Sequence, residues 1–180
     1  MRTALLVIDV QRALFDPEPR PLDADAVIRR INGLAAAARA VRSPVIFVQH
    51  ETADGALVHG GEGWQLERRL EVQPDDQRLH KTTPDAFQRT GLERLLRKVG
   101  MTRVVICGYA TEFCIDTTAR RAAGLGFDVV LVADAHTTHD KPHATAEQIR
   151  LHHNKTLPAL TSFGVAIRAD LAASIDFAPR

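Results

Sequence analysis

Three residues of types that can cooperate in hydrolysis stand where predicted strands end. Asp9 closes the apolar run TALLVID, Lys81 follows a short strand, and Cys114 comes after RVVICG and the turn YATEF. A thiol beside a carboxylate and an ammonium has a mechanism, with the carboxylate as base, the thiol as nucleophile and the ammonium as electrostatic stabiliser. The three residues therefore predict covalent catalysis if the fold brings them together.

Each of the three residues also has an ordinary structural explanation when it is taken alone. Cys114 lies in the first turn of a predicted helix, where the helix N-terminus lowers a thiol pKa, but a small buried helix residue explains it too. Asp9 could cap a loop or helix, and Lys81 could be a solvated lysine. Cys107 lies inside the apolar strand VVIC, where a thiol behaves as a small hydrophobic side chain.

Strands and helices alternate along the chain. Continuous apolar runs predict strands that are buried on both faces, as in a parallel sheet, at 3–9, 45–49, 103–108, 128–135 and 163–167, and a further short strand is expected near 77–81. Helices are predicted at 24–42, 90–99, 114–123, 143–157 and 168–174. The pattern indicates one α/β domain over residues 1–180, with helices on both faces of the sheet. Ligands of such sheets bind beyond the carboxyl ends of the strands.

The composition excludes several other classes of protein. The 180 residues are 45% hydrophobic and 25% charged, as in a globular domain, and 23 basic against 22 acidic residues leave a net charge of +1. That balance predicts no nucleic-acid partner and no anionic membrane partner. The apolar runs are much shorter than the roughly 20 residues that span a bilayer, and MRTALLVIDVQ is predicted to be a strand, without a signal peptide. Two cysteines in different contexts predict free thiols in a reducing cytoplasm.

Four motifs give the sequence a family resemblance. LLVIDVQ at 5–11, HKTTPDAF at 80–87, GYATEFCIDTTARRAAGLGF at 108–127 and VADAHTT at 132–138 resemble the isochorismatase-like cysteine hydrolases. This superfamily includes nicotinamidases and N-carbamoylsarcosine amidases. By motif, the resemblance implies the catalytic triad Asp9, Lys81 and Cys114.

The resemblance also carries expectations about the fold and the turn before Cys114. It implies a three-layer α/β/α fold whose six-stranded parallel sheet has the order 3-2-1-4-5-6. It further implies a cis peptide bond between Tyr109 and Ala110, and an oxyanion hole formed by the backbone amides of Ala110 and Cys114. Relatives commonly form dimers or larger assemblies, so a homo-oligomer is expected.

The long loop at 50–78 and the strand ends supply candidates for a small-molecule pocket. Trp64, the sole tryptophan, is expected to be a pocket wall because this loop borders the active site in the family. Four further residues are weaker candidates for the same pocket, namely Gln11, Phe15, His50 and Tyr109. Gln11 could instead orient the strand-end loop, Phe15 could pack in the core, and the Tyr109 side chain could face away.

The sequence predicts neither a bound metal ion nor another cofactor. Nicotinamidases of this superfamily have an Asp-x-His metal motif after the second strand, but the segment here reads FVQHETADG. Gln49 replaces the aspartate, His50 is out of phase, and His59 is the only other histidine in the loop. Histidines 136, 139, 143, 152 and 153 are interpreted as caps and polar loop contacts.

The function expected from these features is hydrolysis of a small-molecule amide or carbamoyl C–N bond through a thioester on Cys114. One alternative is a vinyl-ether hydrolase of the isochorismatase type, which can work without the cysteine. Another is a binding scaffold without catalysis. The intact set of aspartate, lysine and cysteine favours the amide hydrolase.

Overall fold

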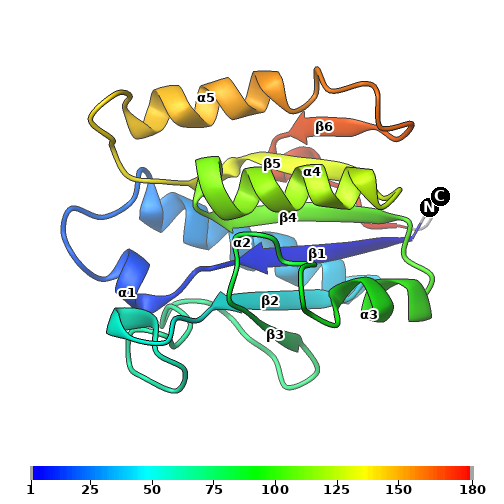
Figure 1. The fold of residues 1–180 in the computed structure, drawn as a ribbon. Coiled ribbons are helices and arrows are strands. Elements are labelled where there is room, and N and C mark those ends of the chain that lie inside the picture. Colours follow the sequence, from blue (N-terminus) through cyan, green and yellow to red (C-terminus); the bar gives the residue numbers. More distant parts are fainter. Residues whose placement is uncertain (1, 179–180) are drawn as a thin grey trace.

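The computed structural model describes residues 2–178, and its centre is a six-stranded parallel sheet (Figure 1). The strand order is β3-β2-β1-β4-β5-β6, which confirms the predicted order. The strands are β1 (Thr3–Ile8), β2 (Val45–His50), β3 (Gln77–Lys81), β4 (Arg103–Tyr109), β5 (Asp128–Thr137) and β6 (Ile167–Asp170).

Helices cover both faces of this sheet and give the expected three layers. In Figure 1, α2 lies behind the sheet, while α3, α4 and α5 lie in front of it. The helices are α1 (Arg12–Phe15), α2 (Ala24–Ala40), α3 (Leu92–Lys98), α4 (Asp116–Gly124) and α5 (Ala146–Thr156). A five-residue π-helical turn, Thr111–Ile115, precedes α4, and short 3-10 turns cover Gly55–Leu57 and Ala172–Ser174.

The continuous apolar strands follow from burial on both faces. Every residue of β1 is buried, with Leu6 and Ile8 in the core beneath α3 and α4, and Leu5 and Val7 in the core beneath α2. Side chains alternate between the two faces of a strand, so a central strand between two helical layers must be apolar at every position.

The predicted elements at the C-terminal end of the chain were wrong. The strand expected at 163–167 begins only at Ile167, and the segment expected as the helix 168–174 continues as β6 before a single 3-10 turn. Gly164 has a φ of +76° and Phe163 is 39% exposed, so the start of FGVAI lies outside the sheet. β6 pairs only with β5 and is partly exposed, which leaves an edge strand with a weak apolar pattern.

Two ends of helices also differ from the sequence prediction. α5 begins at Ala146 because Thr145 forms a capping box with Gln148, in which each side chain bonds the other residue's backbone N–H. The predicted helix from Cys114 to 123 begins as the π-helical turn at Thr111, and regular α-helix starts only at Asp116. The nucleophile candidate therefore lies in an irregular turn.

Within residues 2–178, no helix is both long enough and apolar enough to cross a membrane.

Candidate active site

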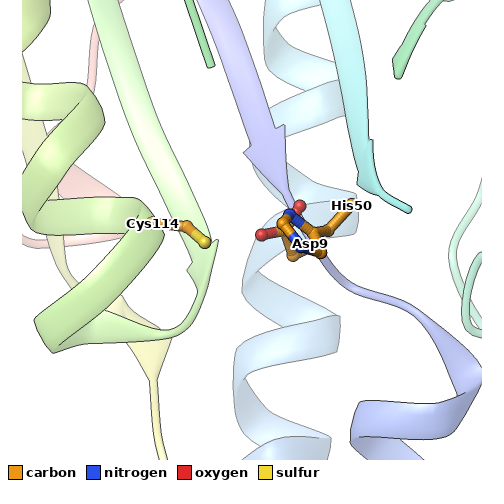
Figure 2. A group of neighbouring side chains, drawn as sticks. All are labelled: Asp9, His50 and Cys114. Carbon is orange, nitrogen blue, oxygen red and sulfur yellow. The ribbon is translucent and has the colours of Figure 1, made fainter. Parts of the chain in front are cut away.

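The three predicted catalytic side chains meet at the carboxyl edge of the sheet. Asp9 follows β1, Lys81 ends β3, and Cys114 lies in the turn after β4. Lys81 Nζ donates hydrogen bonds to Asp9 Oδ2 at 2.8 Å and to Cys114 Sγ at 3.2 Å. Figure 2 shows the sulfur of Cys114 directed toward the Asp9 carboxylate. The geometry thus brings together the carboxylate, ammonium and thiol that the sequence placed at three strand ends.

The backbone around Asp9 fixes the direction of its carboxylate. Asp9 has a left-handed φ of +53°, and its N–H donates to the Val48 carbonyl at 2.8 Å. Aspartate is one of the few residues besides glycine that tolerate this conformation. Asp9 Oδ2 accepts from Lys81, while Oδ1 has no hydrogen-bond partner among the described residues. One carboxylate oxygen is therefore available to accept a proton.

The surroundings of Cys114 act on the pKa of its thiol. Burial, followed by the negative charge of Asp9, raises the pKa of Cys114 to about 12, although Lys81 acts in the opposite direction. The expected lowering of this pKa by a helix N-terminus is not seen. Burial and the Asp9 charge therefore favour the neutral thiol over a thiolate at this position.

The turn that carries Cys114 begins at a cis peptide bond between Tyr109 and Ala110, in agreement with the expectation. Ala110 is buried, and its carbonyl accepts from the N–H groups of Phe113 and Ile115, each at 3.1 Å. The turn therefore winds around the Ala110 carbonyl and holds Cys114 close to Lys81.

Gly108 lets β4 approach β1 beside the site. It has a φ of +117°, and a Cβ built on it would lie 2.0 Å from the Ile8 carbonyl oxygen. A side chain at this position would clash with the strand that leads into Asp9. The spacing between Asp9 and the turn that carries Cys114 therefore depends on this glycine.

His50, one of the pocket candidates, lies directly beside Lys81. Lys81 Nζ is 3.0 Å from His50 Nδ1, and an ammonium can only donate, so Nδ1 accepts and the ring proton is assigned to Nε2. Burial, and then the charge of Lys81, lowers the pKa of His50. The three N–H donors of Lys81 thus meet three acceptors, on Asp9, Cys114 and the neutral imidazole of His50.

The structure places Gln11 beneath the site. Its side chain is fully buried and bonds the backbone of His50 in both directions, as well as the Trp64 carbonyl. Gln49, which replaces the aspartate of the nicotinamidase metal motif, donates to the same Trp64 carbonyl at 2.9 Å. These two buried amides fasten the long loop to the ends of β1 and β2.

Phe15 and Tyr109 form an aromatic contact on another side of the site. Phe15 is fully buried and meets the Tyr109 ring edge-on, with ring centroids 6.0 Å apart. The Tyr109 hydroxyl lies 2.9 Å from His139 Nδ1, and burial raises the pKa of Tyr109 to about 12. Phe15 is thus a packing residue, while Tyr109 links the end of β4 to the segment after β5.

Trp64 lies next to a group of polar side chains that we call the rim group, Glu51, His59 and His80. Its ring contacts His59 at 4.5 Å and His80 at 4.9 Å between centroids. His59 Nδ1 is 2.7 Å from Glu51 Oε2, and His80 Nδ1 is 3.9 Å from the same oxygen. His80 was not predicted at the site because it lies on β3, outside the loop that carries His59 and Trp64, and only the fold brings it beside them.

Two groups of side chains have the geometry to surround a metal ion. Asp9, His50 and Cys114 present ligand atoms within 4.8 Å of one another, and so does the rim group. Lys81 Nζ contacts all three members of the first group, so an ammonium already occupies the position of a cation. The rim group is the pair of histidines and one carboxylate that zinc accepts. The absence of a metal cofactor stays a prediction.

The interpretation of His136 as a cap or polar loop contact was wrong. β5 extends to Thr137, and His136 lies within this strand, fully buried at 0% exposure. Its ring contacts the Thr111 hydroxyl and the Asn154 side chain. The signal available in the sequence was a polar residue directly continuing the buried strand VVLVADA.

Comparison with known proteins identifies the family of this site and fold. The family model of the isochorismatase domain matches residues 3–161. A streptothricin hydrolase of Streptomyces noursei is 40% identical over 142 residues, which cover 78% of this chain and 51% of that protein. A ureidoacrylate amidohydrolase of Pseudomonas syringae is 29% identical and covers 86% of this chain and 77% of its own length.

Comparison with solved structures leads to the same family. A crystal structure described as an isochorismatase family protein has a TM-score of 0.83 and 36% identity, and the match covers 93% of this chain and 98% of that one. The chain belongs to the isochorismatase family. It spans about half the length of the two streptothricin hydrolases that it matches, at 51% and 56%.

Proposed function

We propose that the protein is a cysteine hydrolase that cleaves an amide or carbamoyl C–N bond in a small molecule. The observation that carries the proposal is the buried ammonium of Lys81, within hydrogen-bond distance of both the Asp9 carboxylate and the Cys114 sulfur. A nucleophile beside a base, both oriented by a third group, is the arrangement that covalent catalysis requires.

The first half of the reaction forms a thioester. Asp9 accepts the thiol proton as the Cys114 sulfur attacks the carbonyl carbon of the substrate. The developing oxyanion is stabilised by the backbone amides of Ala110 and Cys114, a type of contact worth roughly 3–4 kcal/mol. The C–N bond then breaks, and Asp9 returns the proton to the leaving nitrogen.

The second half of the reaction releases the acid. Asp9 takes a proton from water, the resulting hydroxide attacks the thioester carbonyl, and the C–S bond breaks. The proton returns to the sulfur, which restores the resting thiol. Throughout, the ammonium of Lys81 favours negative charge on Asp9 and on the Cys114 sulfur, and His50 accepts the third hydrogen bond of Lys81.

The relatives support an amide-type substrate. A streptothricin hydrolase and a ureidoacrylate amidohydrolase are among the proteins that this chain resembles, and the second name specifies an amide bond. A vinyl-ether hydrolase does not need the thiol, whereas here the thiol has both a base and an ammonium beside it. The presence of both Asp9 and Lys81 beside the Cys114 thiol therefore favours the amide reaction.

The proposal is tested by trapping the acyl-enzyme. The protein is mixed with a panel of primary amides, carbamoyl compounds and lactams, and ammonia or amine release is measured alongside the intact mass. We expect release with at least one compound and an acyl adduct located on Cys114 by peptide mapping. Cys114→Ala should remove both signals without changing the fold.

Cys107→Ala is the matched control, because Cys107 is fully buried in β4 and its burial raises the thiol pKa. This variant should retain turnover and the adduct. Full turnover by Cys114→Ala, including turnover of isochorismate, would refute the cysteine mechanism. Alkylation of Cys114 no faster than that of Cys107 would favour a binding scaffold.

A further inference from the structure

We propose that His136 is a positioning residue for the turn Thr111–Ile115, which carries Cys114 and which we call the nucleophile turn. A hydrogen bond between His136 and Thr111 holds this turn in the conformation that catalysis requires. This inference rests on the proposed function, because the turn matters through the oxyanion donors that it carries. The hydrogen bonds of His136 go to Thr111 and Asn154, not to the three catalytic side chains, and the mechanism above does not use it.

A chain of hydrogen bonds connects the turn to the sheet and to α5. Thr111 Oγ1 lies 2.8 Å from His136 Nδ1, and His136 Nε2 lies 2.9 Å from Asn154 Oδ1. Asn154 Nδ2 donates to the Ala133 carbonyl at 2.9 Å. Thr111 and His136 are both fully buried, so water cannot replace a lost hydrogen bond here. Breaking one of these bonds would leave a buried polar group without a partner, which is costly.

The direction of every bond in this chain is determined by its far end. The Asn154 amide donates to a backbone carbonyl, so its oxygen faces His136 and accepts. His136 must then carry its proton on Nε2, which leaves Nδ1 as an acceptor. The Thr111 hydroxyl therefore donates to the ring. Reversal of any one bond would leave two buried acceptors facing each other.

The ring must be neutral for this arrangement to exist. Burial lowers the pKa of His136 to about 4, with Arg150 and His153 lowering it further and Asn154 and Asp134 opposing. At neutral pH the ring therefore remains the acceptor that Thr111 requires.

Thr111 occupies the position in the turn where such an anchor has most effect on catalysis. It directly follows Ala110, and two residues separate it from Cys114. Bonds within the turn converge on the Ala110 carbonyl, whereas the bond from Thr111 ties the turn to a different strand. Loss of this bond would let the Ala110 and Cys114 amides move relative to the site, and oxyanion stabilisation depends steeply on such geometry.

The test compares two reactions of the same sulfur. Acylation by 4-nitrophenyl acetate passes through an oxyanion, whereas alkylation by iodoacetamide displaces iodide directly and forms none. Thr111→Val removes the hydroxyl at nearly constant volume. We expect it to slow acylation of Cys114 about tenfold, a fraction of what a whole oxyanion donor supplies, and to leave alkylation within twofold of the wild type.

Two further variants and a control complete the design. Thr111→Ser keeps the hydroxyl and should restore acylation, and Asn154→Leu, at a half-buried position, should slow acylation in the same direction. Thr3→Val is the matched control, because Thr3 is a buried threonine whose hydroxyl accepts from Arg103 at the other end of β1. It should leave both reactions unchanged.

The outcomes separate this inference from the proposed function. Wild-type protein that forms no acetyl adduct on Cys114 would refute the proposed function. Wild-type acylation that Thr111→Val and Asn154→Leu leave unchanged would overturn the positioning role alone. Equal slowing of acylation and alkylation would also overturn it, since that result indicates general damage to the site.

Discussion

The buried His136 predicts a specific loss of stability in acid. Burial lowers its pKa to about 4 in the folded protein, compared with 6.5 for an ordinary histidine. The unfolded chain therefore binds more protons than the folded protein between these two values. The free energy of unfolding contributed by this residue is intact above pH 6.5 and falls as the pH drops toward 4.

The magnitude follows from the size of the shift. A difference of one pKa unit corresponds to 1.36 kcal/mol, so the full shift is worth roughly 3 kcal/mol, reached below about pH 4. By pH 4.5 roughly 2 kcal/mol of the stability at pH 7 should be lost through His136 alone. Carboxylates that titrate in the same range add to the total, so the comparison requires a variant that lacks only this ring.

The assay is urea unfolding at pH 7 and at pH 4.5. His136→Asn removes the titrating group and keeps an oxygen that can accept from Thr111. This variant should be less stable than the wild type at pH 7 but lose roughly 2 kcal/mol less on acidification. His143→Asn, which removes an exposed histidine, should follow the wild type. Equal acid sensitivity of His136→Asn and the wild type would refute the burial argument.

Three other predictions concern the site and its surroundings. Lys81→Met should lower the free energy of unfolding by about 3–5 kcal/mol in urea titrations, because it leaves the buried Asp9 carboxylate without its cation, and Asp9→Asn in the same chain should recover part of that loss. Gly108→Ala should destabilise by more than about 3 kcal/mol through its clash with Ile8, whereas Gly33→Ala, in an open position of α2, should stabilise by about 0.5–1 kcal/mol in the same measurement. Metal analysis of purified protein should find no stoichiometric zinc or iron. One equivalent of metal ion per chain, lost when the histidines of the rim group are replaced, would contradict this prediction.

The sequence predicted the central sheet well because burial on two faces imposes an apolar pattern that can be recognised without coordinates. The same pattern fails at the edge strand β6, where only one neighbour and partial exposure remain. The strand was therefore expected a few residues too early, and a helix was expected where the strand continues.

The site was predictable where residue type alone determines the chemistry. Asp9, Lys81 and Cys114 stand at strand ends, and the topology of a parallel sheet brings such ends to one edge. His80 was missed and His136 was misinterpreted because their contacts are made with residues far away in the chain, Trp64 for His80 and Thr111 for His136. Spacing in the sequence does not reveal such contacts.

The position of Lys81 on β3 has a consequence for inactivation. β3 forms an edge of the sheet, pairs only with β2, and is largely exposed except at Lys81 itself. Edge strands open at a lower free energy than the strands at the centre of a sheet. Detachment of this single strand would separate the ammonium from the sulfur while the rest of the domain stays folded, so heat should abolish activity before it melts the protein.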